Sequence, residues 1–291
     1  MTAIAERSEA RLQVFRRLRL MKRLSLMIVL AVLMIQTYPI AWIFLSALRP
    51  ASDFAASNSF DLPRSLTLDN FARAFEQGDL PTYFANSLIV AAASIVIIVF
   101  LAMCIAYAMQ VLKFRGSRVV LGLFSAGIIV PVQVALIPLF ILYSKIGLLD
   151  TYQSLIVPMV GFALPMSVYL FVSFYQFIHH EIFEAAILDG CGPFTAFRRV
   201  VLPLSLNTIV TVVFVNAIFI WNDFIFANTF IFSRELKTIP LGLQDYIGSM
   251  GATDWTATFA AVSVTITPVL LLFLVLNRAI IYGLESGATK G

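Results

Sequence analysis

Six stretches of this chain are each long and apolar enough to cross a lipid bilayer as a helix. A helix needs about 20 apolar residues to span roughly 30 Å of hydrocarbon. The stretches run approximately over Leu24–Leu48, Tyr83–Leu112, Val119–Tyr143, Ser154–Ile178, Thr208–Phe232 and Phe259–Gly283. None shows the alternating pattern of an outer-membrane barrel strand. The sequence therefore predicts an all-α, polytopic membrane protein with six transmembrane helices in a single domain over residues 24–283.

The composition agrees with a membrane location. Only 12% of the residues are charged and 60% are hydrophobic, whereas a soluble domain has about a quarter charged residues. The net charge of +4 does not indicate nucleic-acid binding, because a basic surplus in a membrane protein usually sets its topology. We therefore expect lipid, and no nucleic acid, as a partner.

The distribution of basic residues predicts the orientation. Fourteen of the twenty Lys and Arg residues lie on one side of the predicted spans, and such residues are enriched on the cytoplasmic side. This places both termini in the cytoplasm, with residues 1–23 as a basic N-terminal segment and residues 284–291 as a tail. The loop over residues 179–203 is then also cytoplasmic. On the opposite side, Leu68, Phe71, Ala72 and Phe75 have the spacing of a short amphipathic helix.

The predicted cytoplasmic loop contains an unusual polar stretch, "EAAILDGCGPFTAFRRVVLP", from Glu184 to Pro203. Its first part predicts a helix with Phe183, Ala186, Ile187 and Gly190 on one stripe. Gly190 is suited to end this helix, because glycine adopts a left-handed conformation without strain.

A second helix is predicted to follow the turn. Pro193 suits the first helical position, where its missing N–H would have had no partner. Phe194, Phe197 and Val201 are expected to line one face, and Pro203 is expected to interrupt the chain before the fifth span. On these features alone, a docking surface and a plain linker remain equally open.

The same stretch resembles the EAA signature of ABC importer permeases, the binding-protein-dependent transport system inner membrane components. The matching residues are Glu184, Ala185, Ala186, Asp189, Gly190, Leu202 and Pro203. The segments "TLDNFARAF", "WNDFIFA" and "GLESGATKG" resemble the carbohydrate-uptake branch, specifically the maltose-permease inner subunit of the second type.

The resemblance implies a type I ABC importer permease fold in the inner (cytoplasmic) membrane of a bacterium. The chain would form half of a pathway for a di- or oligosaccharide, or a related polyol or sugar phosphate. Its partners would be a second homologous permease, two ATP-binding-cassette ATPase subunits and an extracytoplasmic solute-binding protein. The chain has no G-x-x-x-x-G-K-[ST] motif for ATP phosphates. We therefore expect no cofactor, metal or catalytic residue here, with ATP and Mg used by the partner ATPase.

The resemblance also assigns a role to the loop. Glu184, Ala185, Ala186, Asp189, Gly190 and Pro203 would couple the permease to the ATPase, with Glu184 pairing with a basic residue of that subunit. A solvated surface carboxylate remains the alternative for Glu184.

Polar residues within or near the ends of the spans are candidates for the translocation pathway: Gln133, Asn216, Trp221, Asn222 and Asp223. Polar groups at such positions usually face the bundle or a water-filled cavity. Amides and aromatic rings suit a neutral sugar, but hydrogen bonds between helices would explain the amides equally well. Asp223 has interfacial solvation as an alternative.

Three other functions remain to be compared. An ion-coupled secondary transporter usually shows repeats and charges at the membrane midplane, and the spans contain almost no charge besides Asp223. An intramembrane enzyme lacks support from H-E-x-x-H or G-x-S-x-G motifs. A passive scaffold leaves the polar loop unexplained.

Overall fold

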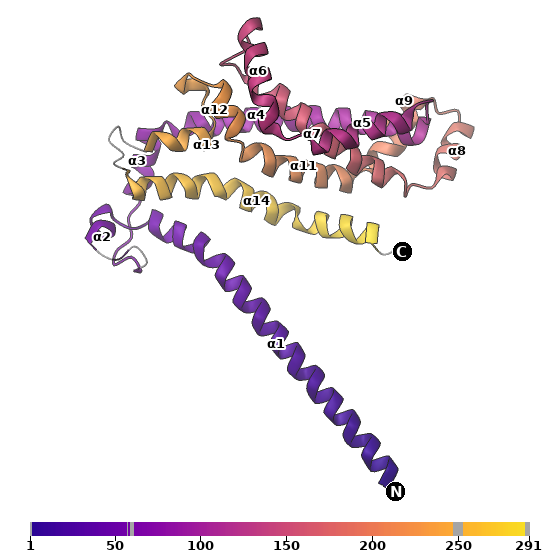
Figure 1. The fold of residues 1–291 in the computed structure, drawn as a ribbon, viewed down its shortest axis with the longest axis horizontal. Helices are drawn as coiled ribbons and strands as arrows, with labels where there is room; N and C mark the ends of the chain where they lie inside the picture. Colours follow the sequence, from indigo (N-terminus) through magenta and orange to yellow (C-terminus); the bar gives the residue numbers. More distant parts are fainter. Residues whose placement is uncertain (1, 57, 59–60, 247–252, 289–291) are drawn as a thin grey trace. The chain divides into compact units, whose positions relative to one another are not determined.

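The structure, a computed structural model, describes residues 2–56, 58, 61–246 and 253–288, and omits the side chains of residues 2–19, 77, 180 and 277–288. The elements are helices (Figure 1). The longer ones are α1 (Thr2–Ala47), α4 (Leu80–Tyr107), α5 (Ser117–Ile129), α6 (Val132–Ile146), α7 (Tyr152–Tyr175), α11 (Leu206–Trp221) and α14 (Trp255–Ala288). The shorter ones are α2 (Ala51–Ala56), α3 (Asp69–Gly78), α8 (His180–Leu188), α9 (Pro193–Ala196), α10 (Leu202–Leu204), α12 (Ile225–Phe230) and α13 (Ile239–Gly242). Two π-helical turns cover Ala108–Leu112 and Phe197–Val201, and two 3-10 turns cover Arg234–Leu236 and Leu243–Tyr246.

The all-α prediction is confirmed, with four described helices long and apolar enough to cross a membrane. These are Leu20–Ala47, Leu80–Leu112, Tyr152–Tyr175 and Trp255–Leu276. Two bent helix pairs are also long and apolar enough when each pair is taken together: Ser117–Ile129 with Val132–Ile146, and Pro193–Leu204 with Leu206–Trp221. The described chain therefore offers four to six spans, and the predicted six correspond to both bent pairs crossing as one span each.

The third span is predicted as one continuous helix, and this is wrong: the structure has two helices there. Helices α5 and α6 meet at an angle of 96°, and the break lies at Val130 and Pro131. Val130 is extended, with φ −69° and ψ 116°, as the residue before a proline prefers. Pro131 has no N–H to continue the helix, so the chain turns there.

The fifth predicted span is also not one helix. Helix α11 ends at Trp221, and α12 begins four residues later at Ile225. The Asp223 carboxylate accepts hydrogen bonds from the backbone N–H groups of Phe226, at 3.4 Å, and Ala227, at 3.2 Å. Satisfying the free N–H groups at a helix start stabilises a new helix, which explains the interruption.

The first helix extends further than the predicted span. Helix α1 begins at Thr2 rather than Leu24 and includes Pro39. The basic residues before Leu24 alternate with Leu, Ala, Glu and Met, which are strong helix formers. The division at residue 23 is therefore a change in composition within one helix.

The chain divides into two compact units: residues Met1–Phe71 with Trp255–Ser263, and Ala72–Asp254 with Val264–Gly291. In the first unit, the side chain of Arg49 is 1% exposed. It pairs with Asp53 at 3.1 Å and donates to the carbonyl oxygens of Asn58 and Asp61. Arg49 thus closes the loop that follows α1.

Helix α3 forms where the short amphipathic helix is predicted, but it packs with another face. The buried residues are Asn70 and Ala74, whereas Leu68 and Phe75 of the expected apolar face are exposed. The Asn70 amide donates to the carbonyl oxygens of Ala47 and Arg49, at 2.7 and 2.8 Å. Hydrogen bonding of the buried amide therefore decides the packed face.

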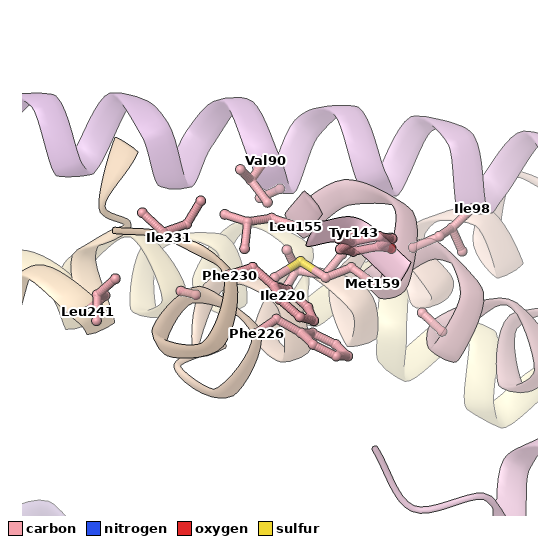
Figure 2. Packing of buried hydrophobic residues seen from close by; sticks show 13 residues of the cluster. Val90, Ile98, Tyr143, Leu155, Met159, Ile220, Phe226, Phe230, Ile231 and Leu241 are labelled. Atoms are coloured by element: carbon pink, nitrogen blue, oxygen red, sulfur yellow. The ribbon is translucent and has the colours of Figure 1, made fainter. Parts of the chain in front are cut away.

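In the second unit, α4, α7 and α11 run side by side (Figure 1). Their buried side chains form a core that includes α12, and Figure 2 shows Val90 pointing from α4 toward Leu155 of α7. Phe226 and Phe230 of α12 stack with ring centroids 5.9 Å apart. Figure 1 shows α8 and α9 at one end of this bundle and α12 and α13 at the other.

Polar side chains fasten residues 234–246 to the start of α4. The Tyr83 hydroxyl donates to the Asp245 carboxylate and accepts from Arg234 Nε at 3.0 Å. Lys237 Nζ lies 2.5 Å from Asp245 Oδ1. Burial raises the pKa of the Asp245 carboxyl, but hydrogen bonds from Lys237 and Tyr83 outweigh burial, and the net pKa lies below its usual range. This network holds the segment before the sixth span.

Candidate functional site

Helix α8 presents one narrow buried stripe and a wide exposed surface. Phe183 and Ala186 are 5% and 8% exposed, as the sequence predicts. Ile187 and Gly190, predicted on the same stripe, are exposed instead. The buried stripe is narrower than predicted, because on this helix only Phe183 and Ala186, three residues apart, are buried.

The exposed surface of α8 contains most of the EAA residues. Glu184, Ala185, Asp189 and Gly190 are all exposed, whereas Ala186 belongs to the buried stripe. Leu188 is 88% exposed. An exposed surface that combines small, acidic and apolar side chains suits contact with another protein.

The end of α8 confirms the predicted role of Gly190. Its φ is +80°, in the left-handed region that glycine adopts at low cost. The N–H of Gly190 donates to the Ile187 carbonyl, and the N–H of Cys191 donates to the Ala186 carbonyl, both at 2.9 Å. These two bonds form a Schellman motif that satisfies the last carbonyls of the helix.

The second helix begins as predicted, with Pro193 in its first turn. Its buried face differs in part from the prediction. Ala196 and Val201 are 5% and 0% exposed and Phe197 is half-buried, whereas Phe194 is 78% exposed. Phe197 and Val201, at the two ends of a π-helical turn, thus lie on the packed side, whereas Phe194 in the preceding α-helical turn does not, and the three predicted residues do not share one buried face.

The segment is joined firmly to the bundle. The Tyr107 hydroxyl, at the end of α4, donates to the Pro193 carbonyl oxygen at 2.9 Å. The Tyr107 ring lies 5.3 Å from the Phe197 ring. Phe183 and Val201 share a buried cluster with residues of α4 and α7. A displacement of α8 is therefore transmitted to α4 and α7, whereas a loosely attached linker would not transmit it.

Tyr107 was not identified from the sequence. Its place at the end of a long apolar stretch is a usable signal, since a buried tyrosine hydroxyl needs a hydrogen-bond partner. Beside it lies a cavity of about 240 Å³ whose lining includes Tyr107, Lys113, Glu184 and Ile187. Glu184 therefore borders a recess and is not on a flat surface.

Pro203 lies just before a bend of 72° between the segment Pro193–Leu204 and α11. The bend itself falls at Ser205, whose hydroxyl donates to the Val201 carbonyl at 2.6 Å. Such back-bonding bends helices, and the missing N–H of Pro203 removes another helical bond. The predicted interruption is thus present two residues after the proline.

Two pathway candidates are engaged in bonds between helices. Asn216 is buried, and its amide donates to Ser167 Oγ on α7 at 3.0 Å and to the Val212 carbonyl at 2.8 Å. The buried Trp221 donates from Nε1 to the Thr265 carbonyl of α14 at 3.0 Å. These contacts favour the structural alternative for both residues.

The other three candidates are not gathered into one site. Asn222 is exposed and donates to the Ile218 carbonyl at 2.8 Å. Asp223 is half-buried and holds the start of α12. Gln133 is exposed on α6. Within the described part of the chain, no three His, Cys, Asp or Glu side chains are grouped as metal ligands.

Comparison with known proteins agrees with this architecture. Residues 98–282 match the family described as "Binding-protein-dependent transport system inner membrane component". A probable ABC transporter permease protein, YurM of Bacillus subtilis, is 36% identical over 87% of this chain and 84% of its own length. The trehalose transport system permease protein SugB of Mycobacterium tuberculosis is 34% identical over 87% of this chain and 92% of its own.

The fold also has solved counterparts. A chain of a bacterial ABC transporter involved in the import of the acidic polysaccharide alginate superposes with a TM-score of 0.78, covering 89% of this chain and 96% of that chain at 20% identity. At this identity the likeness shows the fold, that of an ABC importer permease. The relatives are transport permease subunits and not enzymes. The chain belongs to the binding-protein-dependent transport system inner membrane component family and is a permease subunit of an ABC importer.

Proposed function

We propose that the chain forms half of the translocation pathway of a bacterial sugar importer and receives force from separate ATPase subunits through α8. The relative named for trehalose transport supports a sugar as cargo. The specific sugar class is a di- or oligosaccharide, or a related polyol or sugar phosphate.

The observation that carries the coupling role is the two-sided character of α8. Phe183 packs into the bundle, while Glu184 on the next position is exposed. One face can therefore contact an ATPase while the other passes a displacement to α4 and α7. A solvated carboxylate on a passive linker would not need the Tyr107–Pro193 hydrogen bond.

The other partners follow from this role. A second, homologous permease would supply the remaining half of the pathway, two ATPase subunits would use ATP and Mg, and an extracytoplasmic binding protein would deliver the sugar. The structure of a related alginate transporter in complex with its periplasmic protein supports the last partner. With α8 facing the ATPase, both termini lie in the cytoplasm, as the basic residues predict. Asn222 and Gln133, whose side chains are exposed, are the pathway candidates we retain.

Charge reversal on α8 tests the proposal. In cells that express the whole importer, Glu184→Lys should reduce sugar uptake by about tenfold or more, because a buried charge pair with a basic ATPase residue becomes a repulsion. Gly190→Asp should do the same, and both variants should uncouple ATP hydrolysis while inserting normally. Glu181→Lys is the matched control, since Glu181 is exposed on the same helix one turn earlier. Normal uptake by the Glu184 variant, or uptake that persists without the ATPase as in an ion-coupled transporter, would refute the coupling role.

A further inference from the structure

Two adjacent arginines lie beside a surface cavity that the coupling role does not use. Arg198 and Arg199 line a cavity of about 380 Å³ together with Phe194 and Thr195. Both arginines are exposed, and neither has an ion-pair partner among the described residues. A cavity with two uncompensated guanidinium groups is suited to an anion.

The local helix explains why these side chains meet. Phe194 and Arg198 are four residues apart, as are Thr195 and Arg199, and residues at this spacing are neighbours on a helix surface. The cavity therefore combines two guanidinium groups, one hydroxyl and an aromatic ring. Guanidinium groups match the oxygens of a phosphate in a two-pronged geometry, and a threonine hydroxyl can donate a further hydrogen bond.

The apolar surroundings indicate which phosphate would bind. Phe194 is 78% exposed, and the residues after the arginines include the exposed Leu202, Leu204 and Leu206. Leu206 begins α11, which belongs to a candidate membrane span. The arginines thus lie in Pro193–Leu204, the first limb of a bent helix pair whose second limb is α11. A polar first limb that is bent by 72° from an apolar helix suits the depth at which lipid headgroups are found.

We propose that Arg198, Arg199 and Thr195 bind the phosphate diester of an anionic phospholipid, with Phe194 packing against its glycerol and upper acyl region. Basic recesses at the cytoplasmic ends of membrane helices attract such headgroups. The assignment of this end to the cytoplasm rests on the proposed function, but binding of the lipid does not require an ATPase. The bound lipid would hold the segment between α8 and α11 at the membrane surface.

The test uses the full chain, purified in detergent within its importer complex, and titrates it with short-chain phosphatidylglycerol or phosphatidylcholine while bound lipid is counted by native mass spectrometry. We expect a preference for phosphatidylglycerol that weakens about fivefold in Arg198→Gln or Arg199→Gln and about thirtyfold in the double variant. The matched control is Arg115→Gln with Arg118→Gln. These arginines are also exposed and on the same predicted side, but they do not line the cavity, so the control should bind as the wild type does.

Two further arms identify the source of the phosphate. Phe194→Ser should weaken phosphatidylglycerol binding, and millimolar inorganic phosphate should not displace the lipid. Displacement by inorganic phosphate, with no effect of the Phe194 change, would overturn the lipid assignment in favour of a free anion. Equal binding by the wild type and the double variant would overturn the site itself. The site would also be overturned if the double variant bound lipid as the wild type does but lost the ATPase from the complex, since the arginines would then contact that protein. If the arginine variants bind lipid normally, Glu184→Lys can still reduce uptake. If Glu184→Lys leaves uptake normal, the arginine variants can still lose lipid binding.

Discussion

The Tyr107 hydroxyl donates a hydrogen bond of 2.9 Å to the Pro193 carbonyl oxygen and so joins the end of α4 to the start of α9. The sequence separation between the two residues is large, and the bond crosses from a membrane-spanning helix to the polar segment. Because the carbonyl of a proline in a first helical turn is a fixed acceptor, the bond sets the position of α9 on the bundle. Beside it, the apolar cluster that includes Phe183 and Val201 packs the same segment against α4 and α7.

Removing this hydroxyl should weaken coupling more than folding. Tyr107→Phe keeps the ring that contacts Phe197 but loses about 1 kcal/mol of hydrogen bonding. We expect a small decrease in the thermal unfolding midpoint and a lower ratio of sugar transported to ATP hydrolysed. Tyr143→Phe is the control, because the buried Tyr143 hydroxyl has no hydrogen-bond partner among the described residues. An equal loss of coupling in both variants would contradict a specific role for Tyr107.

The left-handed turn at Gly190 should not tolerate a side chain. A Cβ at Gly190 meets no atom within 4 Å, but the φ of +80° strains any residue that carries one. Gly190→Ala should therefore destabilise the end of α8 by about 1 kcal/mol and reduce uptake. In Gly192→Ala the new Cβ also meets open space, and the φ of −70° is ordinary. Its effect should be close to zero, as a weaker cap is offset by a less flexible unfolded chain. Uptake and thermal unfolding of the two variants, measured side by side, check the difference.

The features that the sequence predicts well are those fixed by local chemistry. Gly190 and Pro193 end and begin helices as expected because each imposes its own backbone conformation. The faces of α3 and α8 are predicted poorly. In α3 a buried amide, Asn70, determines the packing, and in α8 the apolar Ile187 of the predicted stripe remains exposed. Apolar periodicity cannot distinguish a face that packs inward from a face that meets another protein.

The breaks in the third and fifth spans have different causes. Pro131 is visible in the sequence, but prolines such as Pro158 and Pro165 lie inside α7 without ending it, so a proline alone does not reveal a bend of 96°. Asp223 reads as a pathway residue until its hydrogen bonds to α12 are known. Both breaks rest on local chemistry, but many prolines and acidic residues stand in continuous helices, so the residue type alone does not mark the break.

Asp150 gives a prediction about pH. It lies between α6 and α7, and its Oδ1 accepts from the backbone N–H groups of Phe232 and Ser233, at 2.9 and 3.0 Å, and from the Ser233 hydroxyl at 3.0 Å. Burial raises the pKa of this carboxyl, but the hydrogen bonds outweigh burial and the net pKa lies below its ordinary 3.8. A lowered pKa contributes stability above the unfolded value, and this contribution is lost as the pH falls through the folded value.

Asp150→Asn should therefore flatten the acid dependence. Asn retains an oxygen for the same three donors and tolerates the positive φ of 56° at this position, but it does not titrate. We expect the unfolding midpoint of the purified protein to fall less in the variant than in the wild type between about pH 5 and pH 3. Parallel acid curves for wild type and Asp150→Asn would show that this carboxylate contributes nothing.

Gly242 tests the network that fastens residues 234–246 to α4. A Cβ at Gly242 would lie 2.0 Å from Cδ2 of the Tyr83 ring, and that ring is fully buried. Tyr83 cannot move aside easily, because its hydroxyl is hydrogen-bonded to Asp245 and Arg234. Gly242→Ala should therefore destabilise the protein by about 1–3 kcal/mol through overpacking, measured as a lower unfolding midpoint. In Gly161→Ala, at an exposed position inside α7, the Cβ meets no atom within 4 Å, and helix propensity predicts a small gain in stability. Opposite signs for the two substitutions support tight packing of Tyr83 on Gly242, whereas two gains in stability would contradict it.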